Sequence, residues 1–239
     1  MKFGINNPAF LQAGCAGGEI QFFWIKSLED QNDFTITDQA FSEWCVENLQ
    51  FSLDKGKTWN DYVDDQYSLN SGSMILFKNK TGNSLPGNEG SYPCFGSTKK
   101  FSAGGDITSL LYPGIENLPD FALCNLFDGT RIVSAGKMTI KAKSCGSDSL
   151  SSMFARCEYL EDSPIILVDS MGSDGAPSMF RNCVSLKSIK CLTTNAGYRA
   201  FMEWVVGIPD TGKITISSEA DFWGTNSNQL PEGWTVVKQ

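Results

Sequence analysis

Residues 146–192 read GSDSLSSMFARCEYLEDSPIILVDSMGSDGAPSMFRNCVSLKSIKCL, and this stretch contains one pattern twice. Seven residues return at a spacing of 26, namely Gly146, Ser147, Asp148, Met153, Phe154, Cys157 and Leu160 as Gly172, Ser173, Asp174, Met179, Phe180, Cys183 and Leu186. A weaker copy precedes them, with Leu126-Phe127 standing 27 residues before Met153-Phe154, Asp120 near its start and Val133 near its end. Repetition at a fixed period of this length is typical of a solenoid, whose units bury a core only by stacking.

Each copy predicts a short helix, a turn and a strand. Asp148 and Asp174 are suitable N-cap residues, and Pro177 fits the first helical turn. The apolar residues Leu150, Met153, Phe154 and Cys157 follow at helical spacing. The polar turn after Leu160 leads to residues 165–168 (IILV), which are β-branched and short enough for a strand. Matching strands at 138–140, 165–168 and 189–192 predict a parallel ladder.

The pattern Met-Phe-x-x-Cys-x-x-Leu resembles the BspA-like leucine-rich repeats, which are common in surface and adhesion proteins of gut Bacteroidetes and in phages that infect them. Residues 204–207 (WVVG), 212–214 (GKI) and 230–236 (LPEGWTV) are similar to the segment that closes such arrays. The resemblance covers residues 101–239 and implies a repeat domain with a C-terminal β cap. With so few copies, the repeat is either a binding face or only a spacer, and no ligand-binding residue is identified.

The preceding part of the chain predicts an all-β module. Candidate strands at 19–26, 34–37, 49–53 and 74–77 are separated by turn-rich segments, a pattern typical of a β-sandwich. Residues 51–59 (FSLDKGKTW) resemble a hairpin of immunoglobulin-like modules. We therefore expect a mainly β (α+β) protein with an arm at 1–18, an immunoglobulin-like sandwich at 19–100, and the repeat domain with its cap at 101–239.

Composition excludes several classes of function. The net charge of −8 and the pI near 4.6 disfavour nucleic acid and anionic membranes as partners. The chain has no histidine, so it lacks the commonest general base and metal ligand. Two groups of acidic residues could offer oxygens to calcium or supply a carboxylate pair, but their sequence context favours solvated turns and caps: Asp61, Asp64 and Asp65, and Glu116, Asp120, Asp162 and Asp169. We expect no enzyme, no catalytic residue, no metal and no cofactor.

The eight cysteines show no C-x-x-C spacing, which disfavours a structural zinc site. Cys157 and Cys183 occupy equivalent positions on the apolar face of the repeat. We interpret them as reduced, buried residues that behave as small hydrophobes.

The first 18 residues lack the apolar core of a secretion signal, and no run is long enough to span a membrane. They carry Phe3, Ile5, Phe10 and Leu11, more large apolar residues than a solvated tail needs. We expect this arm to anchor the chain to capsid or tail proteins of a virion, as a head fibre, decoration or tail-associated protein, with a homotrimer as the favoured form. A host surface glycan or protein is a further possible partner. The alternative is a bacterial cell-surface adhesin that binds glycan or matrix protein, and a glycan-degrading enzyme is disfavoured.

Overall fold

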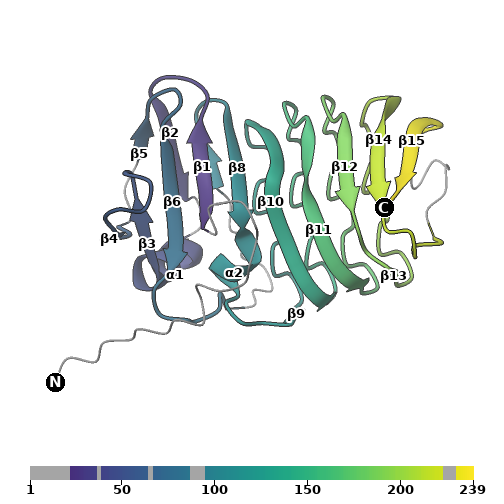
Figure 1. Ribbon diagram of the computed structural model, residues 1–239, viewed down its shortest axis with the longest axis horizontal. Coiled ribbons are helices and arrows are strands. Elements are labelled where there is room, and N and C mark those ends of the chain that lie inside the picture. The colour runs from purple at the N-terminus through teal and green to yellow at the C-terminus, as the bar shows by residue number, and fades with distance from the viewer. Residues whose placement is uncertain (1–21, 37–38, 64–66, 87–94, 223–229) are drawn as a thin grey trace.

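A computed structural model describes residues 22–36, 39–63, 67–86, 95–222 and 230–239, which form a mainly β protein with a β-solenoid of about four turns (Figure 1). The strands are β1 (Phe23–Ser27), β2 (Asn32–Ile36), β3 (Leu49–Ser52), β4 (Asn60–Asp61), β5 (Tyr67–Leu69), β6 (Met74–Asn79), β7 (Phe95–Ser97), β8 (Phe101–Asp106), β9 (Asn117–Leu118), β10 (Ile132–Cys145), β11 (Asp162–Met171), β12 (Ser188–Cys191), β13 (Asn195–Ala196), β14 (Thr211–Ile216) and β15 (Gly233–Lys238). The helices are α1 (Gln39–Asn48) and α2 (Ile107–Leu111). Neither helix in these ranges is long and apolar enough to cross a membrane.

One large sheet of twelve strands runs through the whole molecule, in the order β15-β14-β12-β11-β10-β8-β1-β6-β3-β4, with β9 and β13 paired to the ends of β10 and β11. The strands from β8 to β15 are parallel, and β1, β6, β3 and β4 join them antiparallel. Figure 1 shows this sheet as one continuous surface from the N-terminal strands to β15. The boundary expected near residue 100 falls just before β8, and the sheet continues across it.

The register of the parallel strands follows the sequence repeat. Ile140 of β10 faces Ile166 of β11, 26 residues further on, and Ile166 in turn faces Cys191 of β12. The structure has strands at 138–140 and 165–168, as predicted. The strand predicted at 189–192 ends one residue earlier, at 191, so the predicted parallel ladder is confirmed. β10 and β11 are longer than the apolar runs that predicted them, with 14 and 10 residues.

The helix predicted in each repeat is wrong. The segments 121–130, 148–157, 174–183 and 199–208, here called the turn runs, are chains of overlapping turns. The backbone is left-handed at every fourth residue of each run, including Asp148, Ser152 and Arg156 in the second. Asp148 and Asp174 are therefore not helix N-caps: both have φ +53°. Aspartate adopts this left-handed region more readily than most residues.

Hydrogen bonding between coils explains why turns replace the helix. Within a run, alternate amides close turns, as when Cys157 N donates to Phe154 O at 3.1 Å. The amides between them donate to the next coil, as when Phe154 N donates to Met179 O at 3.0 Å. A helix keeps its N–H groups to itself and is about 10 Å wide, twice the roughly 4.8 Å between strands. The turn runs instead stack at the spacing that the strands of the sheet impose.

The core is a column of stacked aromatic rings between the sheet and the turn runs. Phe127 lies 5.3 Å from Phe154, and Phe154 lies 5.8 Å from Phe180, with near-parallel rings. Trp204 continues the column at 5.4 Å from Phe180. At the other end Phe95 lies 5.3 Å from Phe127, so the column joins the N-terminal part to the solenoid.

The N-terminal part contains the four predicted strands, and also β4, β5, β7 and α1, which were not predicted. β1, β2, β3 and β6 overlap the candidates at 19–26, 34–37, 49–53 and 74–77, although residues 19–21 and 37 lie outside the described ranges. A second sheet, β5-β2-β7, packs on the large one, with Phe34 5.8 Å from Phe101. The helix α1 was not predicted, because its residues QAFSEWCVEN lack a clear apolar stripe.

Candidate functional site

The outer face of the large sheet differs in charge from the rest of the chain. Side chains alternate between core and solvent along a strand, so the buried Met138 and Ile140 separate Lys137, Thr139 and Lys141. The strands of this sheet hold eight lysines and four aspartates, whereas the chain has a net charge of −8. The lysines are Lys26, Lys78, Lys137, Lys141, Lys143, Lys190, Lys213 and Lys238, and the aspartates are Asp61, Asp106, Asp162 and Asp169. Positive charge is thus concentrated on the sheet.

Few of these lysines are neutralised. Among the described residues only Lys143 of the eight forms an ion pair, with Glu116 at 2.9 Å. Three aspartates lie close to these lysines in the sheet: Asp106, in register with Thr139, and Asp162 and Asp169 near the two ends of β11. Asp162 accepts hydrogen bonds from serines, from Ser188 Oγ at 2.7 Å and from Ser134 Oγ at 3.3 Å. Seven of the eight lysines therefore have no described carboxylate within ion-pair distance.

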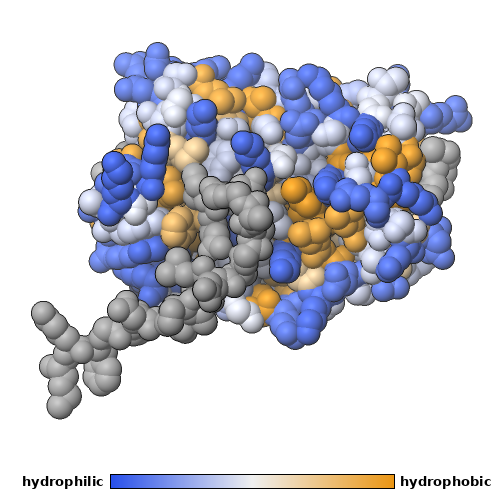
Figure 2. Space-filling view, in the orientation of Figure 1, coloured by the Kyte–Doolittle hydropathy of each residue, from blue (hydrophilic) through white to orange (hydrophobic). Residues whose placement is uncertain are grey.

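The solenoid half of the face carries a patch in which lysines flank aliphatic side chains, here called the lysine–aliphatic patch. Its centre is Ile165 and Leu167 of β11, both half-buried. In the register of the sheet Leu167 is paired with Lys141 on β10, and Ile165 is paired with Lys190 on β12. Figure 2 shows apolar surface over β10 and β11 bordered by hydrophilic side chains. This arrangement suits a ligand that is apolar on one face and anionic at its edge.

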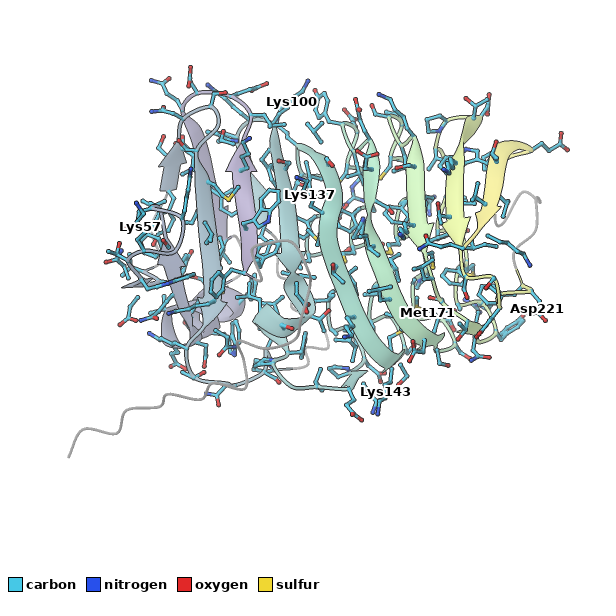
Figure 3. All side chains as sticks on the ribbon, in the orientation of Figure 1. Lys57, Lys100, Lys137, Lys143, Met171 and Asp221 are labelled. Carbon is cyan, nitrogen blue, oxygen red and sulfur yellow. The ribbon has the colours of Figure 1, made fainter. Side chains whose placement is uncertain are left out.

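An indole ring lies on the same face beside Lys137. Trp24 of β1 faces Gly104 of β8, which in turn faces Lys137 of β10. A Cβ on Gly104 would stand 2.3 Å from the Trp24 ring and 2.9 Å from Lys137 Cβ, so the ring covers the glycine. Glycine is needed there because any side chain would lift the indole off the sheet. Figure 3 labels Lys137 on the upper half of β10 and Lys143 near its lower end.

A second aromatic group lies toward the N-terminal edge of the sheet. Phe22 and Trp59 meet edge to face at 4.9 Å, and Lys78 Nζ lies 4.2 Å from the centre of the Trp59 ring. Burial lowers the pKa of Lys78. Because Lys78 is already held by the Trp59 ring, it is less available to a ligand than Lys137, Lys141 or Lys190.

Charged side chains on the turn runs, and on the turns that follow them, form ion pairs between neighbouring coils. Four ion pairs each join neighbouring coils: Arg156–Asp128, Arg181–Glu203 at 2.8 Å, Arg199–Asp174 at 3.1 Å and Lys187–Glu161 at 2.8 Å. These groups neutralise one another, so this side reinforces the stacking. A shallow hollow lies over the fourth turn run, lined by residues 196–203 and Phe222. Its two charged side chains, Arg199 and Glu203, belong to those pairs.

Buried thiols offer no accessible nucleophile. The six described cysteines, Cys45, Cys124, Cys145, Cys157, Cys183 and Cys191, are all buried. Cys157 Sγ donates to Phe127 O at 2.9 Å, and Cys183 Sγ donates to Phe154 O at 3.0 Å, which agrees with the prediction of reduced, buried residues. Burial raises the pKa of Cys191 to about 11 and also raises that of Cys183. Within the described ranges no three His, Cys, Asp or Glu residues are grouped to hold a metal.

Of the residues singled out from the sequence, Asp61, Asp162 and Asp169 lie on strands of the large sheet, and none of the lysines or apolar residues of the face was among them. Phe3, Ile5, Phe10 and Leu11 lie outside the described residues, as do Asp64 and Asp65. Asp61 accepts from Gln50 Nε2 at 2.9 Å, and this hydrogen bond together with the ion pair to Lys80 lowers its pKa. Asp120 accepts from Ser147 N at 2.8 Å, and Glu116 and Asp162 have the partners named above.

The face itself was missed, although its signal was present. Lys137, Thr139, Lys141 and Lys143 alternate with smaller or apolar residues, which is the period of a strand with a polar outer side. Only the register of the parallel strands brings Lys141 beside Leu167 and Ile165 beside Lys190.

No protein-family model matches the chain, and neither the curated proteins nor the solved structures include a significant match to it.

Proposed function

We propose that the chain is a non-enzymatic attachment protein in which the solenoid is a rigid body and the outer face of the large sheet contacts a surface. The observation that carries this proposal is the gathering on one face of lysines without a described ion-pair partner, half-buried aliphatic side chains and Trp24. The aromatic column supports the rigid body, because each ring is fixed by the coil before and after it.

The finer assignment of the two parts belongs to the same proposal. Residues 101–239 are assigned to BspA-like repeats on the recurrence of Met-Phe-x-x-Cys-x-x-Leu. Residues 19–100 are assigned to an immunoglobulin-like module, supported by the packing of the sheet β5-β2-β7 on the large sheet. In this view the turn runs occupy the side of the repeat where helices were expected.

The proposed setting is the virion of a Bacteroidetes-infecting phage, where the chain is a head fibre, decoration or tail-associated protein. Residues 1–18 act as the anchor through Phe3, Ile5, Phe10 and Leu11, and the sheet face meets the host. The alternative is a cell-surface adhesin of a bacterium, which would use the same face. The two settings differ in what holds the chain, and the anchor therefore discriminates between them.

Deleting residues 2–18 tests the anchor. The shortened chain should keep the circular dichroism spectrum of the full chain and should be missing from purified particles of a phage that carries its gene. A chain with Phe3, Ile5, Phe10 and Leu11 changed to Ser is the matched control, because it keeps the length of the arm. Full incorporation of either variant would show that the anchor lies elsewhere, and absence of the unmodified chain from particles would remove the virion setting.

Binding to cells tests the contact surface separately. The purified full chain, labelled with a fluorophore, should bind host cells, and prior removal of their surface polysaccharide should reduce the bound signal. A chain that binds no cells, with or without that treatment, would contradict the attachment function.

A further inference from the structure

We propose that the outer sheet face between Trp24 and Lys190 binds an acidic polysaccharide, a chain of sugar rings that bear carboxylates. This inference rests on the attachment function and specifies the class of ligand. Its elements are the Trp24 ring, Lys137 beside it, and the lysine–aliphatic patch on β10, β11 and β12.

Charge complementarity indicates an anionic ligand. Lys137 and Lys141 are exposed, Lys190 is half-buried, and none of the three has a described carboxylate within ion-pair distance. Asp162 accepts from Ser134 and Ser188, and Asp106, in register with Thr139, accepts from Ser109. Asp169, two residues beyond Leu167, limits the cationic area at the other end of β11. The ammonium groups of these lysines repel one another, although the chain as a whole has a net charge of −8. An anion bound between them relieves that repulsion.

The apolar groups on the face indicate sugar rings. Pyranose rings present flat C–H faces that pack on indole and aliphatic surface, while their hydroxyls and carboxylates project at the edge. The Trp24 ring covers Gly104, and Ile165 and Leu167 are flanked by Lys190 and Lys141. A chain running across the strands would place its rings on the apolar groups and its carboxylates near the lysines.

The spacing of the cations favours a polysaccharide over a nucleic acid. Lys141 and Lys190 belong to β10 and β12, which are two strand spacings or about 10 Å apart, and the register offsets the two lysines by two residues, or about 7 Å, along the strands. Duplex DNA carries one charge per roughly 1.7 Å of axis, so a sparse row of lysines leaves most phosphates uncompensated. The strands of the large sheet also contain no arginine, the residue that binds phosphate in two-pronged fashion. A carboxylate on every second sugar suits the observed spacing better.

The experiment measures binding of the full chain to polygalacturonate and hyaluronate by isothermal titration calorimetry, with fully methyl-esterified polygalacturonate as the neutral counterpart. Binding to at least one acidic polymer is expected, and it should weaken between about 0.05 and 0.15 M salt, since exposed charges are screened there. The neutral polymer should bind about tenfold more weakly or not at all.

The triple variant Lys137→Gln/Lys141→Gln/Lys190→Gln tests the face, and it should lose about tenfold in affinity. The matched control Lys55→Gln/Lys57→Gln/Lys187→Gln removes the same charge at exposed lysines elsewhere and should stay within about twofold. Trp24→Phe keeps an aromatic ring and should lose less affinity than Trp24→Ala. Circular dichroism spectra identical to that of the unmodified chain show that each variant is folded.

The outcomes separate this inference from the attachment function. Equal binding of acidic and neutral polymers, or equal loss in the triple variant and its control, overturns the acidic-polysaccharide proposal. Tighter binding of duplex DNA or of phosphatidylserine vesicles than of either acidic polymer also overturns it. If host cells are still bound in those cases, the attachment function stands with another ligand. If neither cells nor polymers are bound, both fail.

Discussion

Phe154 is held between two other phenylalanine rings, and its environment follows from the repeat that places one ring in every coil. It is completely buried, with Phe127 at 5.3 Å and Phe180 at 5.8 Å. Its own amide donates to Met179 O in the next coil, and its carbonyl accepts from Cys183 Sγ. One side chain therefore supports the coils on both sides.

Replacing Phe154 with Ala should lower the free energy of unfolding by about 3–5 kcal/mol, the usual cost of truncating a buried phenylalanine. Urea denaturation followed by circular dichroism measures this change. Val184→Ala is the control, because Val184 is 58% exposed and should change stability by less than about 0.5 kcal/mol. Equal midpoints for the two variants would contradict the aromatic column.

The buried thiols should resist alkylation in the folded chain. Burial raises the pKa of Cys124 and of Cys191 to about 11, above the ordinary thiol value of 9.0. A raised pKa lowers the fraction of reactive thiolate at pH 8, and burial also excludes the reagent. Peptide-resolved mass spectrometry should show slow modification of both residues by iodoacetamide, and rapid modification in urea. Fast labelling without denaturant would show that these coils open.

At the scale of the elements, the sequence predicted the strands better than the segments opposite them. Residues 165–168 and 74–77 are short β-branched or apolar runs, and a strand is the element that such runs favour. The spacing of Leu150, Met153, Phe154 and Cys157 fits one face of a helix, but overlapping turns also place these residues in the core. Intercoil hydrogen bonds decide between the two, and they depend on neighbours that a single repeat does not contain.

The fourth turn run was missed for a related reason. Residues 204–207 were assigned to the closing segment, yet Phe180 N donates to Trp204 O as Phe154 N donates to Met179 O. Each position of the third turn run has its equivalent in the fourth run 25 residues later, and not 26. The side chains at these equivalent positions also differ. The binding face was missed because Lys141, Leu167 and Lys190 are distant in sequence and meet only through strand register.

A left-handed position in a turn run should tolerate serine but should lose stability with a β-branched side chain. Ser178 has φ +55°, a region that costs a β-branched residue about 1–2 kcal/mol. Ser178→Val should therefore lower the free energy of unfolding by about that amount in thermal or urea denaturation. Ser173→Val, at an exposed position with ordinary φ in the same coil, is the control and should change stability by less than about 0.5 kcal/mol. Similar losses in both variants would argue against the turn geometry.

At the scale of the whole molecule, two features join the N-terminal part to the solenoid. The large sheet passes from β1 through β8 to β10, and the aromatic column passes from Phe95 to Phe127. Backbone hydrogen bonds cross the same junction, since Phe95 N donates to Leu126 O at 2.9 Å and Leu85 N to Leu111 O at 2.7 Å. The two parts thus share core and sheet and are not separated by a linker.

Because of this shared core, the described body should unfold as one cooperative unit and not as two domains. Differential scanning calorimetry should give a single transition whose calorimetric and van't Hoff enthalpies agree. The variant Phe154→Ala, in the solenoid, should lower the midpoint of unfolding reported by a fluorophore attached to Lys55 in the N-terminal part, and Val184→Ala should not. A solenoid variant that shifts only part of the transition would contradict this expectation. It would mean that the coils unfold while the N-terminal part stays folded, as happens in repeat proteins whose neighbouring units are weakly coupled. The continuous hydrogen-bonded path from β6 to β11 argues for the single transition, since no strand along it can separate without exposing its neighbour's backbone groups.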